Sequence, residues 1–131
     1  MHESVARAVA GMLDDAGFVC VFTAPPSALD CAEPIVCVQG AFERDARMAD
    51  GEERGRIAVD VLVVREVGLV AEEDCERCER MLRAYAWEPW ADCGRYRIVS
   101  LDTTAPAFRE VDGSGRHVWA FAVECVVARL A

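Results

Sequence analysis

Apolar residues recur at helical spacing in two segments of the chain. Ser4 precedes the first segment, where it can cap a helix whose apolar stripe contains Val5, Val9, Met12, Leu13 and Ala16. The second segment follows Gly68, carries acidic residues at 72–74 that suit the first turn of a helix, and stops before Pro89. Its stripe contains Cys75, Cys78, Leu82, Tyr85 and Ala86. The pattern predicts one helix over residues 4–16 and another over about residues 72–86.

Shorter apolar runs rich in β-branched and aromatic residues predict the strands. Pro25 and Pro26 follow the run at residues 18–22, and Pro34 precedes the run at 35–38. The run at 57–64 is apolar on both faces apart from Asp60, as in a central strand. A further run covers residues 96–101. The last two runs, at 108–111 and 118–127, flank the turn-forming sequence Asp-Gly-Ser-Gly at 112–115, which predicts a closing hairpin.

The order helix, strand, strand, strand, helix, strand, strand (α-β-β-β-α-β-β) is too irregular for a doubly wound parallel sheet. It predicts an α+β fold with two helices packed on one face of a mostly antiparallel sheet. A length of 131 residues suits one domain, so we expect residues 1–131 to form a single domain without an internal repeat. The stretch at about 41–56 is densely charged, and we expect it to be a long solvated loop, which is usually a functional or a disordered segment.

Charge narrows the range of partners. The chain contains 14 basic residues, all arginine, and 23 acidic residues, which gives a net charge of -9. General affinity for nucleic acid needs clustered positive charge, so we expect no sequence-specific nucleic-acid binding. Every apolar run is far shorter than the ~20 residues of a membrane span, so we expect neither a signal peptide nor a membrane anchor. Seven cysteines, mostly within apolar patterns, favour a reducing, cytoplasmic setting.

Cysteine supplies the sharpest candidate for chemistry. Cys75 and Cys78 form a CxxC pair, which is typical of redox dithiols and of half a zinc site, with Cys31 or Cys93 as further ligands. However, the pair follows an acidic run that disfavours the thiolate, and both residues lie on the stripe that must face the sheet. We therefore expect both to be buried core residues, and we expect the same of Cys20, Cys37 and Cys125. Cys31 and Cys93 lie in predicted loops, where a cross-link stays open.

Nothing in the sequence points to catalysis. The two histidines, His2 and His117, stand near the first residue and at a strand start, without a catalytic partner in the sequence. No phosphate-binding loop, nucleophile elbow or zinc-protease motif is present. Acidic pairs such as Asp14 and Asp15 are expected to be solvated parts of helix faces. We expect no enzymatic activity and no cofactor.

Two features leave a choice between contacts within the chain and contacts with another subunit. Asp60 and Glu124 are single carboxylates in otherwise apolar strands, so each must reach water, an arginine of the same chain, or a partner across a subunit boundary. Trp87 and Trp90 flank the proline that ends the second helix. They either pack on the adjacent loop or serve as interface anchors.

In the order of its elements the chain resembles the tail terminator, or tail completion, proteins of long-tailed bacteriophages and prophages. The similarity covers nearly the whole chain. It comprises the helix at 5–16, the strands at 18–22 and 35–38, the long charged stretch, the strand at 57–64, the helix whose sequence Ala-Glu-Glu-Asp starts at 71, the strand at 96–101 and the closing strand at 116–125. The resemblance rests on the order of these features.

This resemblance implies a non-enzymatic structural protein that assembles as a ring, typically a hexamer, on the end of the tail tube and joins it to the head connector. Such a protein acts in the host cytoplasm during assembly and then in the virion tail, and its partners are itself, the tube protein and the connector. The candidate contact residues are Arg44, Asp45, Arg47, Asp50, Glu52, Glu53, Arg54, Trp87 and Trp90. Two alternatives stay open: a small metal-binding or redox domain centred on Cys75 and Cys78, and another head–tail joining (neck) protein.

Overall fold

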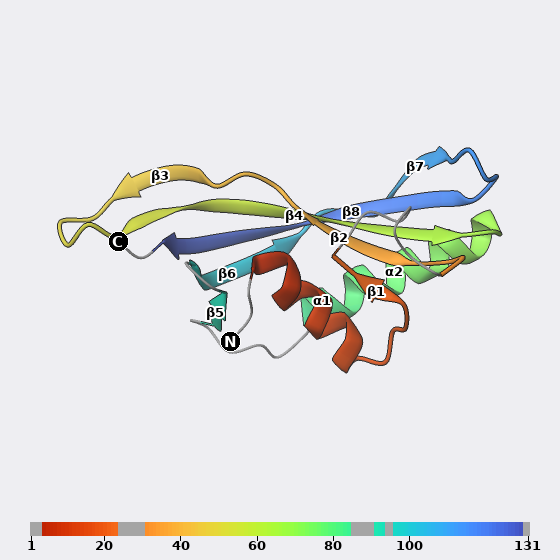
Figure 1. The fold of residues 1–131 in the computed structure, drawn as a ribbon, viewed down its shortest axis with the longest axis horizontal. Coiled ribbons are helices and arrows are strands. Elements are labelled where there is room, and N and C mark those ends of the chain that lie inside the picture. Colours follow the sequence, from red (N-terminus) through yellow and green to blue (C-terminus); the bar gives the residue numbers. More distant parts are fainter. Residues whose placement is uncertain (1–3, 24–30, 85–90, 94–95, 130–131) are drawn as a thin grey trace.

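The computed structural model describes residues 4–23, 31–84, 91–93 and 96–129 (Figure 1). Two helices, α1 (Val5–Asp15) and α2 (Gly68–Ala84), each precede a group of strands. The first group is β1 (Val21–Phe22), β2 (Ile35–Gln39), β3 (Glu43–Arg47) and β4 (Glu53–Arg65), and the second is β5 (Ala91–Cys93), β6 (Tyr96–Thr103), β7 (Ala107–Val111) and β8 (His117–Arg129). The predicted α+β class is confirmed, but the order α-β-β-β-β-α-β-β-β-β contains more strands than the sequence pattern predicted.

All these strands belong to one sheet with the order β1-β2-β4-β8-β6-β5, in which β3 also pairs with β4 and β7 with β8. The central strands β4 and β8 have 13 residues each and pair antiparallel over their whole length, from Glu53 opposite Arg129 to Arg65 opposite His117. Among the described pairings only β1 and β2 are parallel. Both helices pack on one face of the sheet, as predicted, and neither covers the other face (Figure 1).

The core lies between the helices and the sheet. Directly opposite residues of β4 and β8 point to the same face, so Val59 with Val123 and Val61 with Phe121 meet the helices and are buried. The helices bury Val9, Leu13, Cys75, Cys78 and Leu82 against them. The helical and strand periodicities of the sequence therefore predict which side chains are buried.

The two helices begin for different reasons. The Ser4 hydroxyl accepts a hydrogen bond from the backbone N–H of Arg7 at 3.2 Å, which confirms its predicted capping role. α2 begins at Gly68, where an added Cβ atom would lie 3.0 Å from Nδ1 of His117, so glycine permits a close approach of the helix to β8. The predicted start at residue 72 is therefore wrong, and the acidic residues 72–74 lie in the second turn.

The stretch at about 41–56 is a β-hairpin and not the long loop that its charge predicted. β3 pairs with residues 53–56 of β4 across a turn at 48–52, in which Gly51 adopts a positive φ of 89°. Side chains of opposite charge stabilise the pairing, as between Arg56 and Asp45. All side chains of β3 are exposed, so no alternation of apolar and polar residues marks the strand in the sequence.

The backbone contains an internal repeat. Adding 64 to a residue number in β3 or β4 gives the equivalent residue of β7 or β8, so that 43–47 corresponds to 107–111 and 53–65 to 117–129. The irregularities correspond too, because the pairing register shifts between residues 44 and 46 in β3 and between residues 108 and 110 in β7. A local twofold axis through the pair Val59–Val123 therefore relates the two hairpins.

The turns and the strand interruptions are also related by the offset of 64 residues. In the turns, the backbone N–H of Met48 donates to the carbonyl oxygen of Glu52 at 2.7 Å, and that of Asp112 donates to Arg116 at 2.8 Å. At the interruptions, the N–H of residue 40 donates to residue 58 at 2.8 Å, and that of residue 104 donates to residue 122 at 2.9 Å. Only six of the 31 residues at 35–65 are identical to their equivalents at 99–129, at positions 41, 51, 58, 59, 63 and 65. The expectation of no repeat is therefore wrong for the fold, because the pairing is retained while most side chains differ.

Candidate interaction surfaces

The two hairpins project from opposite ends of the sheet (Figure 1). We call residues 43–56 the ionic end and residues 107–119 the apolar end. The ionic end contains all the charged contact residues predicted from the sequence: Arg44, Asp45, Arg47, Asp50, Glu52, Glu53 and Arg54. The other two predicted contact residues, Trp87 and Trp90, lie outside the described residues.

Glu53 is the centre of the ionic end. Its Oε2 lies 3.1 Å from Nη1 of Arg44 and 3.7 Å from Nη2 of Arg47, and its Oε1 accepts a hydrogen bond from Nε of Arg129 at 3.0 Å. The hydrogen bonds from Arg129 and then Arg44 hold the pKa of Glu53 below its ordinary value, because the positive charges favour the carboxylate. In return, Glu53 raises the pKa of Arg129.

Arg129 and the aromatic residues beside it were not among the contact residues predicted from the sequence. Arg129 is the last residue of β8 and lies directly opposite Glu53 in the sheet. Its guanidinium carbon lies 4.6 Å from the centre of the Phe42 ring, a cation–π contact, and Phe42 packs on Tyr96 with ring centres 5.6 Å apart. No sequence signal links these residues to Glu53, because only the register of β4, β6 and β8 brings them together.

Arginines outnumber carboxylates on the helix side of this end. Arg44 and Arg47 lie opposite Gly55 and Glu53, which belong to the set of β4 residues that faces the helices. Three guanidinium groups and one carboxylate give this group a formal charge of +2. The side chains of Arg44 and Arg47 are 56% and 65% exposed, so their remaining N–H donors are available to a partner. We call Arg44, Arg47 and Arg129 the arginine face.

Smaller ion pairs stabilise the rest of the ionic end. Nε of Arg56 lies 3.2 Å from Oδ2 of Asp45. Glu52 contacts two arginines, with Oε1 3.6 Å from Nε of Arg54 and Oε2 3.4 Å from Nη2 of Arg97. The exposed pair of Arg56 and Asp45 contributes about 0 to 1 kcal/mol. The side chain of Glu52 is only 16% exposed, so its two pairs are partly buried.

The apolar end carries different chemistry on the equivalent backbone. The equivalents of Arg44, Arg47 and Glu53 are Phe108, Val111 and His117. Phe108 and Val111 are 54% and 50% exposed, and the ring of Phe108 meets that of Trp119 edge-on, with ring centres 6.1 Å apart. Val67, just before α2, and Leu69, in its first turn, are exposed apolar side chains as well. This end also carries the exposed Arg109 and Glu110 and the Arg116–Asp112 ion pair, so the two ends differ in the balance of apolar and charged side chains.

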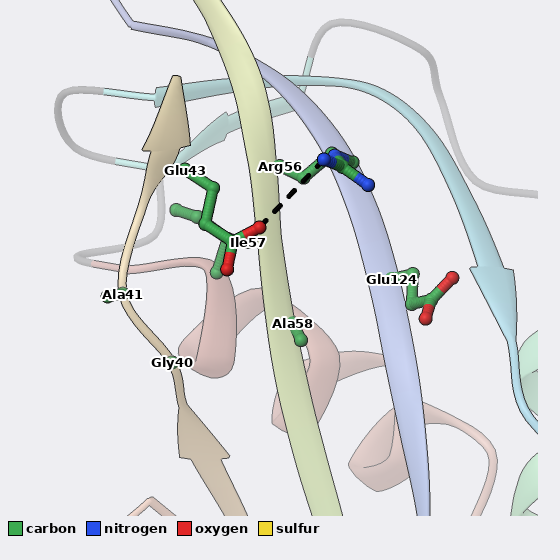
Figure 2. A pocket seen from close by; sticks show the side chains of 7 residues that line it. All are labelled: Gly40, Ala41, Glu43, Arg56, Ile57, Ala58 and Glu124. Carbon is green, nitrogen blue, oxygen red and sulfur yellow. Dashed lines mark ion pairs between the residues drawn. The ribbon is translucent and has the colours of Figure 1, made fainter. Parts of the chain in front are cut away.

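Two of the pockets on the face without helices are related by the same twofold axis, and a third, of about 390 Å³, lies among apolar residues such as Val38 and Leu62. Figure 2 shows the first, of about 230 Å³, where the interruption between β2 and β3 leaves room beside Ala58, Arg56 and Glu124. The second, of about 270 Å³, includes the equivalent residues 104, 105, 107 and 120–122, together with Asp60. Asp60 and Glu124 are thus equivalent positions of the repeat, and both belong to the open face, where Glu124 is exposed and Asp60 half-buried. A contact of either with another subunit stays a prediction.

Most cysteines of the described residues are buried. Cys37, Cys75 and Cys78 are fully buried, as predicted, and burial raises the pKa of each thiol to about 12. Thiols with such a pKa stay protonated at neutral pH, which opposes redox exchange and metal ligation by Cys75 and Cys78. Cys125 is also buried. Within the described part of the chain, no group of three or more metal-ligating side chains occurs.

The predictions for Cys20 and the first strand are partly wrong. β1 covers only Val21–Phe22 of the expected strand at 18–22, and Cys20 precedes it with a positive φ of 57°. Its side chain is consequently exposed rather than buried. Its thiol is hydrogen-bonded to that of Cys31, which raises the pKa of Cys20. The side chain of Cys93 is not among those described.

No protein-family model matches the chain, and no curated protein matches it. None of the described helices is long and apolar enough to cross a membrane. What the protein does is therefore inferred from the geometry above and from the order of its elements.

Proposed function

We propose that the protein is a structural subunit of a bacteriophage or prophage tail, which forms a ring, typically a hexamer, on the end of the tail tube and joins the tube to the head connector. In this proposal it has no enzymatic activity and no cofactor, assembles in the host cytoplasm and then remains in the virion tail. The observation that carries the proposal is the pair of hairpin ends, which project in opposite directions on equivalent backbones and carry unlike side chains.

A ring of identical subunits is built from heterologous contacts, in which one patch of each copy meets a different patch of the next copy. A terminator also binds two unlike structures, the tube and the connector. A subunit with an ionic end and an apolar end, joined by strands of 13 residues, offers unlike surfaces for such contacts. A twofold dimer needs instead one patch that is complementary to itself.

The open face of the sheet supports the same proposal. It carries the carboxylates of Asp60, Asp102 and Glu124, of which Asp102 and Glu124 lie directly opposite each other on β6 and β8. None of the three has an ion-pair partner among the described residues. Around a central channel, such carboxylates would repel the phosphates of DNA and let it slide through. We assign the open face to the wall of that channel.

Electron microscopy of the protein mixed with tail tubes of the phage or prophage that encodes it tests the proposal. We expect rings at the ends of the tubes, and an unrelated protein of similar net charge serves as the control. Binding along the tube walls, or no binding, would contradict the proposal. Binding to isolated connectors but not to tube ends would favour another head–tail joining protein instead.

The metal-binding or redox alternative makes a different prediction. Stoichiometric zinc in the purified protein, or an acidic thiol at Cys75, would support it. The raised pKa of Cys75 and Cys78 favours thiols that react with a thiol reagent only after unfolding. Thiol titration with and without urea distinguishes the two outcomes.

A further inference from the structure

The helix layer covers the two ends of the sheet unequally. Gly68, at the start of α2, touches His117 and so reaches the apolar end. The first turn of α1 instead lies beside Gln39, whose Oε1 accepts a hydrogen bond from the N–H of Ala6 at 3.1 Å. β3 and the outer part of β4 extend beyond both helices (Figure 1). Within the described residues, the helix side of the ionic end therefore has no helix packed on it.

The unequal cover is clear when the helix contact of Gln39 is compared with that of its equivalent residue in the second half of the repeat. Thr103, the equivalent of Gln39, donates a hydrogen bond through its hydroxyl to Oε1 of Glu79 at 3.2 Å. Glu79 is the twelfth residue of α2, whereas Ala6 is the second residue of α1. α2 therefore extends much further towards the tip of its hairpin than α1 does, and neither of the described helices covers the surface beneath the ionic end.

This uncovered surface is the arginine face. It has a formal charge of +2, after the carboxylate of Glu53 is counted, in a chain whose net charge is -9. Arg44 and Arg47 have no other ion-pair partner in the part of the chain that the structure describes. Guanidinium groups bind carboxylates through pairs of parallel hydrogen bonds, so a cluster of exposed carboxylates is the complementary ligand.

α2 carries such a cluster. Glu76 lies four residues after Glu72 and three after Glu73, so the three share one side of the helix, where Glu73 and Glu76 are exposed and Glu72 is half-buried. None of them has an ion pair among the described residues. The other carboxylates of α2 are already paired, Asp74 with Arg65 and Glu79 with Arg83.

We propose that the arginine face docks on the Glu72–Glu73–Glu76 face of α2 in a second copy of this chain. The ionic end and the first half of α2 lie at opposite ends of the molecule (Figure 1), so one copy cannot join its own two surfaces. The contact is heterologous, and successive copies form a ring if their rotation closes. This inference rests on the proposed function and adds the residues that close the ring.

Charge reversal on each surface tests the contact. We expect Arg44→Glu/Arg47→Glu and Glu72→Arg/Glu73→Arg/Glu76→Arg each to weaken self-association about a hundredfold or more, because like charges facing each other across an interface cost several kcal/mol. Sedimentation equilibrium of the full chain measures the association. Mixed in equal amounts, the two variants should associate again, because the reversed arginine face fits the reversed helix.

The control is Asp14→Arg, which reverses the charge of an exposed carboxylate of α1 that belongs to neither surface and has no ion pair among the described residues. This variant should associate as the unaltered chain does. Circular dichroism checks that each variant is folded.

A mixture that does not associate would overturn the inference, and so would an unaltered chain that stays monomeric at every concentration measured. Duplex DNA binding that depends on Arg44 and Arg47, without self-association, would also overturn it in favour of a phosphate ligand. The tube experiment is independent. If rings form on tube ends but the two variants do not associate when mixed, the proposed function holds and this contact is rejected. If the variants associate when mixed but the protein does not cap tubes, the contact holds and the proposed function is rejected.

Discussion

The ionic end and the apolar end share strand lengths, register shifts and turn hydrogen bonds, yet their surfaces differ. At the ionic end the ring of Phe42 covers Gly55, whereas at the apolar end the equivalent residue of Gly55 is Trp119, which supplies its own ring. Both hairpins are therefore supported by an aromatic ring, but the ring comes from different positions. The comparison teaches that backbone pairing can be kept while the exposed side chains diverge.

The largest expected effect is at Gly55. An added Cβ would collide with the carbonyl oxygen of Glu43 and lie 2.8 Å from the Phe42 ring, so we expect Gly55→Ala to lower the free energy of unfolding by about 1–3 kcal/mol or more. Gly113→Ala, in the turn of the apolar end, is the matched control, since its Cβ would meet nothing within 4 Å. Its effect should stay within about 0.5 kcal/mol. Urea unfolding measures both, and equal losses would contradict the difference in packing.

The pH dependence of stability provides a second test of the difference between the two ends. The folded pKa of Glu53 is below its ordinary value of 4.5, so its stabilising contribution is complete above that value and is lost as the pH falls through the folded pKa. We expect Glu53→Gln to lower the urea midpoint at pH 7 and to remove this part of the acid dependence, because three arginines then lose their carboxylate. His117→Gln, at the equivalent position, should leave the acid dependence below pH 4.5 unchanged. Identical acid profiles for Glu53→Gln and the unaltered chain would count against the cluster.

Salt should separate the two ends further. The pKa of Asp112, in the turn of the apolar end, is lowered mainly by hydrogen bonds from the backbone N–H groups of Arg116 and Ser114, whereas that of Glu53 is lowered by guanidinium groups. Ions screen exposed charge pairs more than they weaken local backbone hydrogen bonds. We expect the destabilisation by Glu53→Gln to shrink on going from low to high salt, and that by Asp112→Ala to change less. Equal salt dependence in unfolding measurements would refute this distinction.

The smallest expected effect on stability is at Phe108. Its side chain is half exposed and its described ring contact is with Trp119, so Phe108→Ala should cost roughly 0.5–1.5 kcal/mol, the usual contribution of such a pair. Arg44→Ala, at the equivalent position of the ionic end, should change self-association more than stability. A loss of several kcal/mol in Phe108→Ala would mean that the apolar end belongs to the core.

Prediction from the sequence worked where one face of an element is buried. The stripe of α1, its Ser4 cap and the buried pair Cys75 and Cys78 follow from periodicity, because a helix places every third or fourth residue on one side. It failed for β3, whose side chains are all exposed, and for Cys20, which lies just outside a strand of two residues. Exposed elements leave no alternation of apolar and polar residues, so local pattern cannot find them.

The residues of the arginine face were also only partly predictable from the sequence. The charged stretch that contains Arg44, Arg47 and Glu53 was recognisable from composition, since charges of both signs gather there. Arg129 was not, because it lies 76 residues from Glu53 and meets it only through the register of β8 on β4.

The amino-acid sequence alone determined the α+β class, the presence of both helices with their buried stripes, and the apolar side of the central strands, because hydrophobic periodicity acts within a few residues of the chain. The tertiary structure decided the repeat, the hairpin at residues 43–56 and the grouping of three arginines around Glu53. These features depend on which strands pair and in which register, and strand pairing joins residues far apart in the chain.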